Sequence, residues 1–249
     1  DPLQIARGGT VAIVLVAAAF LLGLVLFGGL DGLEKRRIGV IAILFVGAAM
    51  FWSGFEQAGS SLNLFAERHT DRELFGFLVP ASWLQSINPL FIITLAPFFA
   101  WLWVWLAPRN LDPSIPAKFA LGLIQLGLGF GVMAIAAGFV AQGGTVLPTW
   151  LVPTHLLHTT GELCLSPVGL SAITKLSPKR YVGQLMGIWF IAAALGNLVA
   201  GLLAGRFDPR AVEQMPGLFT QILVSTAGLG VLLLLFLRPI RRLASGPDR

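Results

Sequence analysis

Long stretches without charged residues divide the chain. Four stretches contain no Asp, Glu, Lys or Arg, namely residues 8–30, 74–108, 181–205 and 214–237. Each is long enough for a helix of about 20 residues, the length that crosses a bilayer. Apolar segments between them complete the pattern, which predicts seven membrane spans near residues 9–30, 38–66, 83–107, 118–142, 149–176, 181–205 and 217–238. Short turns rich in Gly and Pro separate the predicted spans.

The spans are predicted to be α-helices. No segment shows the strict alternation of apolar and polar residues that is typical of a membrane barrel. Glycines lie inside the spans at Gly127, Gly129, Gly131, Gly196, Gly201 and Gly205. Small residues at such positions let helices approach one another closely in lipid. We therefore expect an all-α membrane protein.

Composition and charge support this class and indicate an orientation. Of 249 residues, 56% are hydrophobic and 12% are charged, against about a quarter charged in soluble domains. A C-terminus in the cytoplasm puts 12 basic residues on that side, in loops 35–37, 109–118, 175–180 and 238–249, and 5 on the other. Cytoplasmic loops are enriched in Lys and Arg, so a cytoplasmic C-terminus is predicted. The net charge is +5, but the sequence shows no cluster of basic residues interleaved with aromatic ones. Nucleic acid is therefore not an expected partner.

Two carboxylates lie inside predicted spans, where insertion of a charged group costs at least about 2.5 to 3.5 kcal/mol. In the first polar stripe, helical spacing aligns Trp52, Glu56, Ser60 and Asn63. In the second, the same spacing aligns His155, His158 or Thr159, Glu162 and Ser166. A buried carboxylate changes its protonation state as a cationic partner arrives or leaves, so both acids are predicted to couple protons to binding. The alternative is that each acid only forms an ion pair or hydrogen bond that locks two helices together.

Other chemistry finds less support in the sequence. His155, His158 and Glu162 share a face and have a spacing that allows metal ligation from one helix, although no second cluster supplies further ligands. No H-E-x-x-H or G-x-S-x-G sequence is present, so an enzyme is not expected. Asn88-Pro89 is a third feature, because proline in a membrane helix is used at binding sites and hinges.

These residues lie in four segments that resemble one family. The segments are FWSGFEQAGSSLNLFA (51–66), SINPLFIITLAP (86–97), HLLHTTGELCLSPVGLSAITKLSP (155–178) and MGIWF (186–190). They closely resemble the C-terminal half of bacterial proton-dependent oligopeptide transporters of the major facilitator superfamily. The resemblance implies a six-helix C-terminal bundle at 34–249, preceded by a linker or lateral transmembrane helix at 1–33. It also implies a multi-pass protein of the bacterial inner (plasma) membrane.

The resemblance assigns roles to matching residues. Glu162 and Asn88 resemble the residues that face the amino end of the peptide, and Glu56 resembles an acid of proton coupling and gating. Trp52 and Trp189 resemble walls of the side-chain pockets, and Ser166 lies one turn beyond Glu162 on the same stripe. Some family members carry a second acid where this chain has Phe55, so either Glu56 or Glu162 is left as the carrier of the coupled proton.

The expected function is proton-coupled symport of di- and tripeptides, with the proton as coupling ion and no further cofactor. An N-terminal six-helix bundle, which the family uses for the peptide carboxylate, is an expected partner together with the lipid bilayer. Two alternatives come from other classes. One is a carrier of metal or other cations that uses His155, His158 and Glu162, and the other is a structural membrane fragment that transports nothing.

Overall fold

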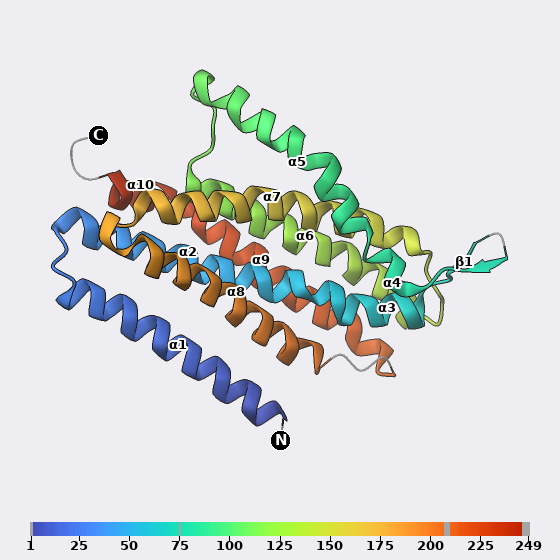
Figure 1. Cartoon of the computed structure of the whole chain (residues 1–249). Helices are drawn as coiled ribbons and strands as arrows, with labels where there is room; N and C mark the ends of the chain where they lie inside the picture. The colour runs from blue at the N-terminus through green and yellow to red at the C-terminus, as the bar shows by residue number, and fades with distance from the viewer. Residues whose placement is uncertain (1, 75, 207–209, 246–249) are drawn as a thin grey trace.

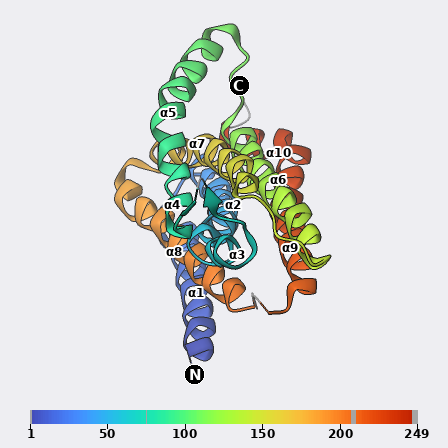
Figure 2. The same cartoon turned by 90° about the vertical axis from the view of Figure 1, so that its right-hand side faces the viewer.

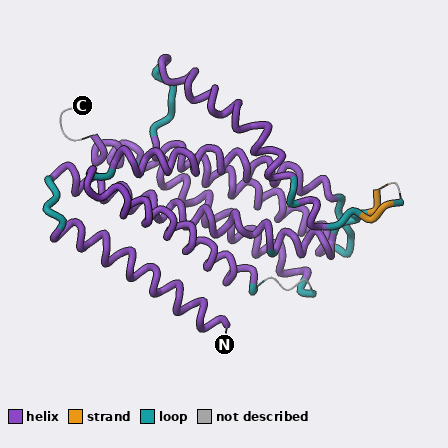
Figure 3. The backbone as a smooth tube through the Cα atoms, viewed as in Figure 1, coloured by secondary structure: helices purple, strands orange, loops and turns teal. Residues whose placement is uncertain are grey.

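The computed structural model describes residues 2–74, 76–206 and 210–245, and it is a helical bundle (Figures 1 and 3). The long helices are α1 (Pro2–Phe27), α2 (Gly32–Phe55), α5 (Ile87–Leu106), α6 (Ile115–Ala141), α7 (Leu151–Leu176), α8 (Val182–Ala204) and α9 (Met215–Leu235). The short helices are α3 (Ser61–His69), α4 (Ala81–Leu84) and α10 (Leu237–Ser245). One small hairpin of β1 (Glu73–Leu74) and β2 (Phe77–Leu78) precedes α4. The all-α fold predicted from the sequence is confirmed.

Six helical segments among the described residues are long and apolar enough to span a membrane. Seven spans were predicted, and the one that does not reach this apolarity is 149–176. That segment forms α7, a helix of 26 residues that runs alongside the other long helices (Figure 1). Its polar face, which carries the second predicted stripe, lowers its hydropathy. The candidate site residues of α7 and its weak apolar signal therefore have the same origin.

The span predicted at 38–66 lies inside one segment long and apolar enough to cross a membrane, Gly32–His69, but the helix in it is interrupted, which corrects the continuous polar stripe expected from the sequence. Helix α2 ends at Phe55, a 3-10 turn covers Glu56–Gly59, and α3 begins at Ser61 after Ser60 leaves helical geometry, with φ −126° and ψ −97°. Hydrogen bonds of the Gln57 side chain stabilise the chain at this break. Its Nε2 donates to the carbonyl of Ala200 on α8 at 3.0 Å, and its Oε1 accepts from Ser61 Oγ.

The long helices lie roughly side by side, with two exceptions at the edges of the bundle (Figures 1 and 2). Helix α1 lies on the outside and packs on α8. Helix α5 starts beside α7 and then diverges from the bundle, and no residue of α5 is buried by the described part of the chain. The other five long helices enclose the apolar core.

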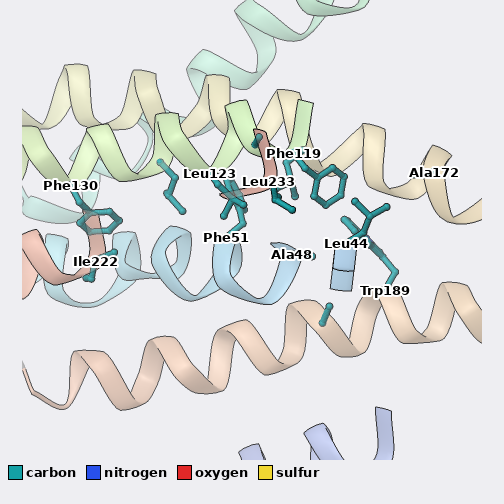
Figure 4. Close-up of a cluster of buried hydrophobic side chains, with 14 of the residues drawn as sticks. Leu44, Ala48, Phe51, Phe119, Leu123, Phe130, Ala172, Trp189, Ile222 and Leu233 are labelled. Carbon is teal, nitrogen blue, oxygen red and sulfur yellow. The ribbon is translucent and has the colours of Figure 1, made fainter. Parts of the chain in front are cut away.

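Large apolar side chains fill the space between α2, α6, α8 and α9 (Figure 4). Phe51, Phe119 and Phe130 are fully buried there. Phe51 stacks on Phe55 with ring centroids 5.5 Å apart, and Phe119 meets the edge of Trp189. The first pair lies within α2, whereas the second joins α6 to α8, and aromatic rings bury large areas at such contacts.

Glycines bring α6 into direct backbone contact with its neighbours, as the sequence predicted for Gly127 and Gly129. A Cβ added to Gly127 would lie 2.8 Å from the Cβ of Ala227 on α9. A Cβ added to Gly161 on α7 would lie 2.8 Å from the carbonyl oxygen of Gly122 on α6. Gly196 meets Trp52 in the same way, whereas Gly201 and Gly205 have no close contact of this kind. The helices of the core are thus packed at the distance that only glycine permits.

The basic loops gather at one end of the bundle, as their sequence positions predicted (Figure 1). At this end Asp31 caps α2, accepting from the Glu34 backbone N–H at 2.7 Å while the Glu34 carboxylate accepts from Asp31 N–H. Arg180 bonds the Gly29 carbonyl at 2.6 Å and lies 3.6 Å from the Glu34 carboxylate, so it joins the start of α8 to the α1–α2 turn. Lys118 pairs with Asp112 at 2.7 Å.

Candidate functional site

Glu162 lies near the middle of α7 and has an unused carboxylate oxygen. Its Oε2 is buried and has no hydrogen-bond partner among the described residues. Asn88, from the first turn of α5, lies near enough to interact with this carboxylate. Its Nδ2 donates to Thr159 Oγ1 at 2.8 Å, which fixes the amide over α7. The structure therefore brings together the two residues that the sequence placed in separate segments.

The backbone of α5 explains how Asn88 reaches this place. Helix α5 begins at Ile87, so Pro89 falls in the first turn, where its missing N–H breaks no hydrogen bond within the helix. The hinge that the sequence suggested at Asn88-Pro89 is therefore not a kink inside a helix. Pro89 instead helps to start α5, and this start places the Asn88 amide against Thr159.

Glu56 lies at the break between α2 and the 3-10 turn, and its side chain is exposed. The carboxylate has an electrostatic interaction with Glu162. Because α2 ends at Phe55, the predicted stripe does not continue as one helical face through Ser60 and Asn63. Asn63 nevertheless keeps a buried Oδ1 without a hydrogen-bond partner among the described residues.

Gln57 is the residue of this region that the sequence reasoning missed. It is fully buried, and its amide joins Ser53, Ser61 and Ala200. With Gln57 turned inward, its neighbour Glu56 is left on the outer side of the turn. The repeat of polar residues at Ser53, Gln57 and Ser61, four apart, was the signal for this inward face.

The two predicted pocket tryptophans have different surroundings. Trp52 is half-buried and its Nε1 has no hydrogen-bond acceptor among the described residues. Trp189 is 4% exposed, and its ring covers Gly169, where an added Cβ would lie 2.0 Å from Trp189 Cη2. Trp189 therefore packs α8 against α7, whereas Trp52 keeps a buried N–H donor that no described residue accepts. Ser166 is half-buried on α7, one turn after Glu162.

The histidines of α7 are packed into the bundle. His155 is 3% and His158 is 1% exposed, and the His158 ring lies 4.9 Å from the ring of Phe130 and directly over Gly129. No group of three or more His, Cys, Asp or Glu side chains in the described ranges is arranged to hold a metal ion. The described residues therefore offer no set of metal ligands that would support the metal-carrier alternative.

Comparison with known proteins decides the family. The sequence model of PTR2, described as the POT family, matches residues 30–217. The chain belongs to the POT family. Peptide transporter YePEPT of Yersinia enterocolitica subsp. palearctica serotype O:3 (strain YE-P4) is 43% identical to this POT chain over 98% of the chain and 48% of the relative. Dipeptide and tripeptide permease A of Escherichia coli (strain K12) is 31% identical over 94% of the chain and 52% of the relative.

A solved structure shows the same fold. The crystal structure of the peptide transporter POT in complex with sulfate superposes with a TM-score of 0.89 at 36% identity, over 99% of this chain and 49% of that chain. The chain thus spans about half the length of the POT relatives it matches. These relatives are transporters, which confirms the expectation that the chain is not an enzyme. Together with the six apolar helices, they make this chain a multi-pass membrane protein.

Proposed function

We propose that the protein containing this chain performs proton-coupled symport of di- and tripeptides by alternating access. The observation that carries the proposal is the buried Glu162 Oε2, which has no hydrogen-bond partner among the described residues. Leaving a buried charged acceptor unpaired is costly. A ligand that brings a cationic donor to this oxygen removes that cost, so the site favours a positively charged group.

The amino end of a peptide has the chemistry that this site lacks. Its ammonium group offers three N–H donors, of which one can bind Glu162 Oε2 in a charge-assisted hydrogen bond. Asn88, held beside the carboxylate by Thr159, presents an amide oxygen as a second acceptor. Trp52 Nε1 and Ser166 add polar contacts from α2 and α7 for the rest of the ligand. The names of the relatives, peptide transporter and dipeptide and tripeptide permease, support the same substrate class.

Glu56 is proposed as the gating and proton-coupling carboxylate. It lies at an exposed break between helices and interacts electrostatically with Glu162. Repulsion between two carboxylates favours a proton on one of them. An ammonium bound at Glu162 offsets that repulsion and favours release of the proton, so peptide binding is coupled to proton release. No cofactor beyond the proton takes part in this scheme.

The proposal extends to the parts of the protein that recognise the other end of the peptide. A second six-helix bundle is proposed to supply the contacts to the peptide carboxylate and to close the site against α5. The protein is proposed to lie in the bacterial inner (plasma) membrane with the C-terminus in the cytoplasm, because the basic loops gather at that end. Helix α1 is proposed to be the lateral linker helix, consistent with its place outside the bundle.

The direct test is uptake of a labelled dipeptide by the complete protein in proteoliposomes. We expect an inward proton gradient to drive accumulation above the equilibrium level, and a protonophore to reduce uptake to equilibration. An unlabelled tripeptide should compete with the label, whereas a free amino acid should not. Accumulation that ignores the gradient would refute proton coupling, and failure of any peptide to compete would refute the substrate class.

Replacement of Glu56 by Gln tests the coupling role separately from binding. In the Glu56→Gln variant we expect gradient-driven accumulation to fall at least about tenfold, because the carboxylate that takes up the proton is gone. Peptide exchange across a membrane without a gradient should continue, because Glu162 and Asn88 are unchanged. The matched control is Glu67→Gln, which removes an exposed acid from α3. Equal accumulation by the wild type and the Glu56→Gln variant would remove Glu56 from the coupling scheme.

The structural-fragment alternative receives no support from the site. It requires the two acidic stripes to pack against each other as a closed helix contact. Glu56 is instead exposed, and Glu162 keeps an unpaired oxygen among the described residues.

A further inference from the structure

The short helix α10 is strongly amphipathic and lies at the end of the bundle where the basic loops gather (Figure 1). Helical spacing places Arg238, Arg241 and Arg242 on one face. On the opposite face Ile240 is buried, at 4% exposed, and anchors α10 to the bundle. Arg37 Nε donates to the Ala244 carbonyl at 3.3 Å and ties the far end of α10 to α2. The position of α10 is therefore fixed from the inside, while its arginines face outward.

An apolar groove lies beside α10, between the middle of α2 and the end of α9. It has a volume of about 380 Å³ and only apolar lining residues, namely Ile43, Leu232, Leu233, Phe236, Pro239, Ile240 and Leu243. Leu232 and Phe236 are half or more exposed. Both helices that form its walls are membrane spans, so the groove lies at the depth where acyl chains begin.

A basic hollow adjoins the groove on the side of the bundle end. It is lined by Arg36, Arg238 and Arg242, here called the arginine rim, together with Pro239 and Leu243. Pro239 and Leu243 also line the apolar groove, so the two hollows share a wall. The described residues offer no salt bridge to any arginine of the rim, whereas Arg180 and Lys118 at the same end are paired with acids.

We propose that the groove and the arginine rim form a binding site for one anionic phospholipid of the leaflet on the side of the C-terminus. The phosphodiester lies on Arg36, Arg238 and Arg242, and one acyl chain lies in the groove along Leu232 and Phe236. Arginine presents paired N–H donors that match phosphate oxygens. Basic pockets between helix ends at the membrane surface have the charge and depth that anionic headgroups need.

The charge and shape of the site select this occupant. Three unpaired cations repel a cationic ligand and favour an anion. A free phosphate would use the rim and leave the apolar groove empty, whereas a neutral lipid would use the groove and leave the rim unpaired. Only a molecule with both parts, a negatively charged head joined to an acyl chain, engages the shared wall at Pro239 and Leu243.

The test measures phosphatidylglycerol retained by the complete purified protein, by native mass spectrometry and by the rise in melting temperature on lipid addition. The variant carries Arg36→Gln, Arg238→Gln and Arg242→Gln, and we expect its apparent affinity for phosphatidylglycerol to fall about tenfold or more. The control carries Arg109→Gln, Lys175→Gln and Lys179→Gln, which removes the same charge from the same end, and it should bind as the wild type does. A third variant carries Arg36→Lys, Arg238→Lys and Arg242→Lys, which keeps the charge but loses the paired N–H donors, so its affinity should lie between those of the wild type and the Gln variant.

Two further ligands separate the parts of the proposal. Glycerophosphoglycerol, which has the head but no acyl chains, should not raise the melting temperature, and phosphatidylethanolamine should raise it less than phosphatidylglycerol does. Equal loss of binding in the rim and control variants would show diffuse charge attraction and overturn the site. Binding of the headgroup alone, or unchanged lipid retention by a folded rim variant, would overturn it as well.

Discussion

Replacing Glu162 by Gln is expected to reduce peptide uptake by the complete protein about ten- to hundredfold. The change keeps the size of the side chain but removes the negative charge that accepts the ammonium. A hydrogen bond to a charged group is worth about 1.5–3 kcal/mol, and each 1.4 kcal/mol is about a factor of ten. The loss should appear mainly as weaker peptide binding, so competition by unlabelled dipeptide should shift to higher concentration. Initial uptake of labelled dipeptide into proteoliposomes measures both quantities.

Two controls keep this prediction specific. Glu67→Gln removes an exposed acid from α3 and should transport like the wild type. Thr159→Val removes the hydroxyl that accepts from the Asn88 amide at 2.8 Å, and it should weaken binding less than Glu162→Gln does, because the charge remains. A Glu162→Gln variant with wild-type affinity would exclude Glu162 from the peptide site. It would leave the family and the fold untouched.

The second large effect is expected from Gly161→Val, which acts on folding. A Cβ at Gly161 would lie 2.8 Å from the carbonyl oxygen of Gly122, and backbone atoms cannot move aside as a flexible side chain can. Overpacking of this kind costs about 1–3 kcal/mol and sometimes more. We therefore expect a melting temperature several degrees below that of the wild type in detergent, with part of the protein aggregated on size-exclusion chromatography.

Gly138→Val on α6 is the matched control for this change. An added Cβ at Gly138 meets no atom of another described element within 4 Å, so the same substitution meets open space there. It should leave the melting temperature within about a degree of the wild type, since valine costs a helix little relative to glycine. If the two variants melt alike, the close contact of α6 and α7 does not limit stability.

The sequence predicted the helices well because insertion into lipid depends on local composition. A charge-free stretch such as 181–205 has to cross the membrane whatever surrounds it, and α8 at Val182–Ala204 follows that stretch closely. The same reasoning failed at Glu56, where the helix ends. The cause is the bond from Gln57 to Ala200, 143 residues away along the chain. The spacing of Ser53, Gln57 and Ser61 marks an inward polar face, but the pairing with Ala200 cannot be inferred from local sequence.

The sequence was enough to propose residues for the candidate site, but it did not predict the contacts between them. Glu162 stood out because an acid in a span is rare and costly, and the resemblance joined Asn88 to it. The bond from Asn88 to Thr159 and the burial of Trp189 over Gly169 depend on how three helices meet. The sequence also gave no sign of the arginine rim as a unit, because Arg36 and Arg238 come from opposite ends of the bundle sequence.

The attachment of α5 has a mechanical consequence. Two polar contacts hold the helix besides its packing on α7. Near its start, Asn88 donates a hydrogen bond to Thr159. Near its end, Lys118 Nζ lies 4.1 Å from the centroid of the Trp103 ring. A helix of 20 residues is about 30 Å long. A rotation of about ten degrees at Asn88 would therefore carry the far end through about 5 Å. A small change in the contacts at the start of α5 is therefore enlarged into a displacement of several ångströms where Trp103 meets Lys118.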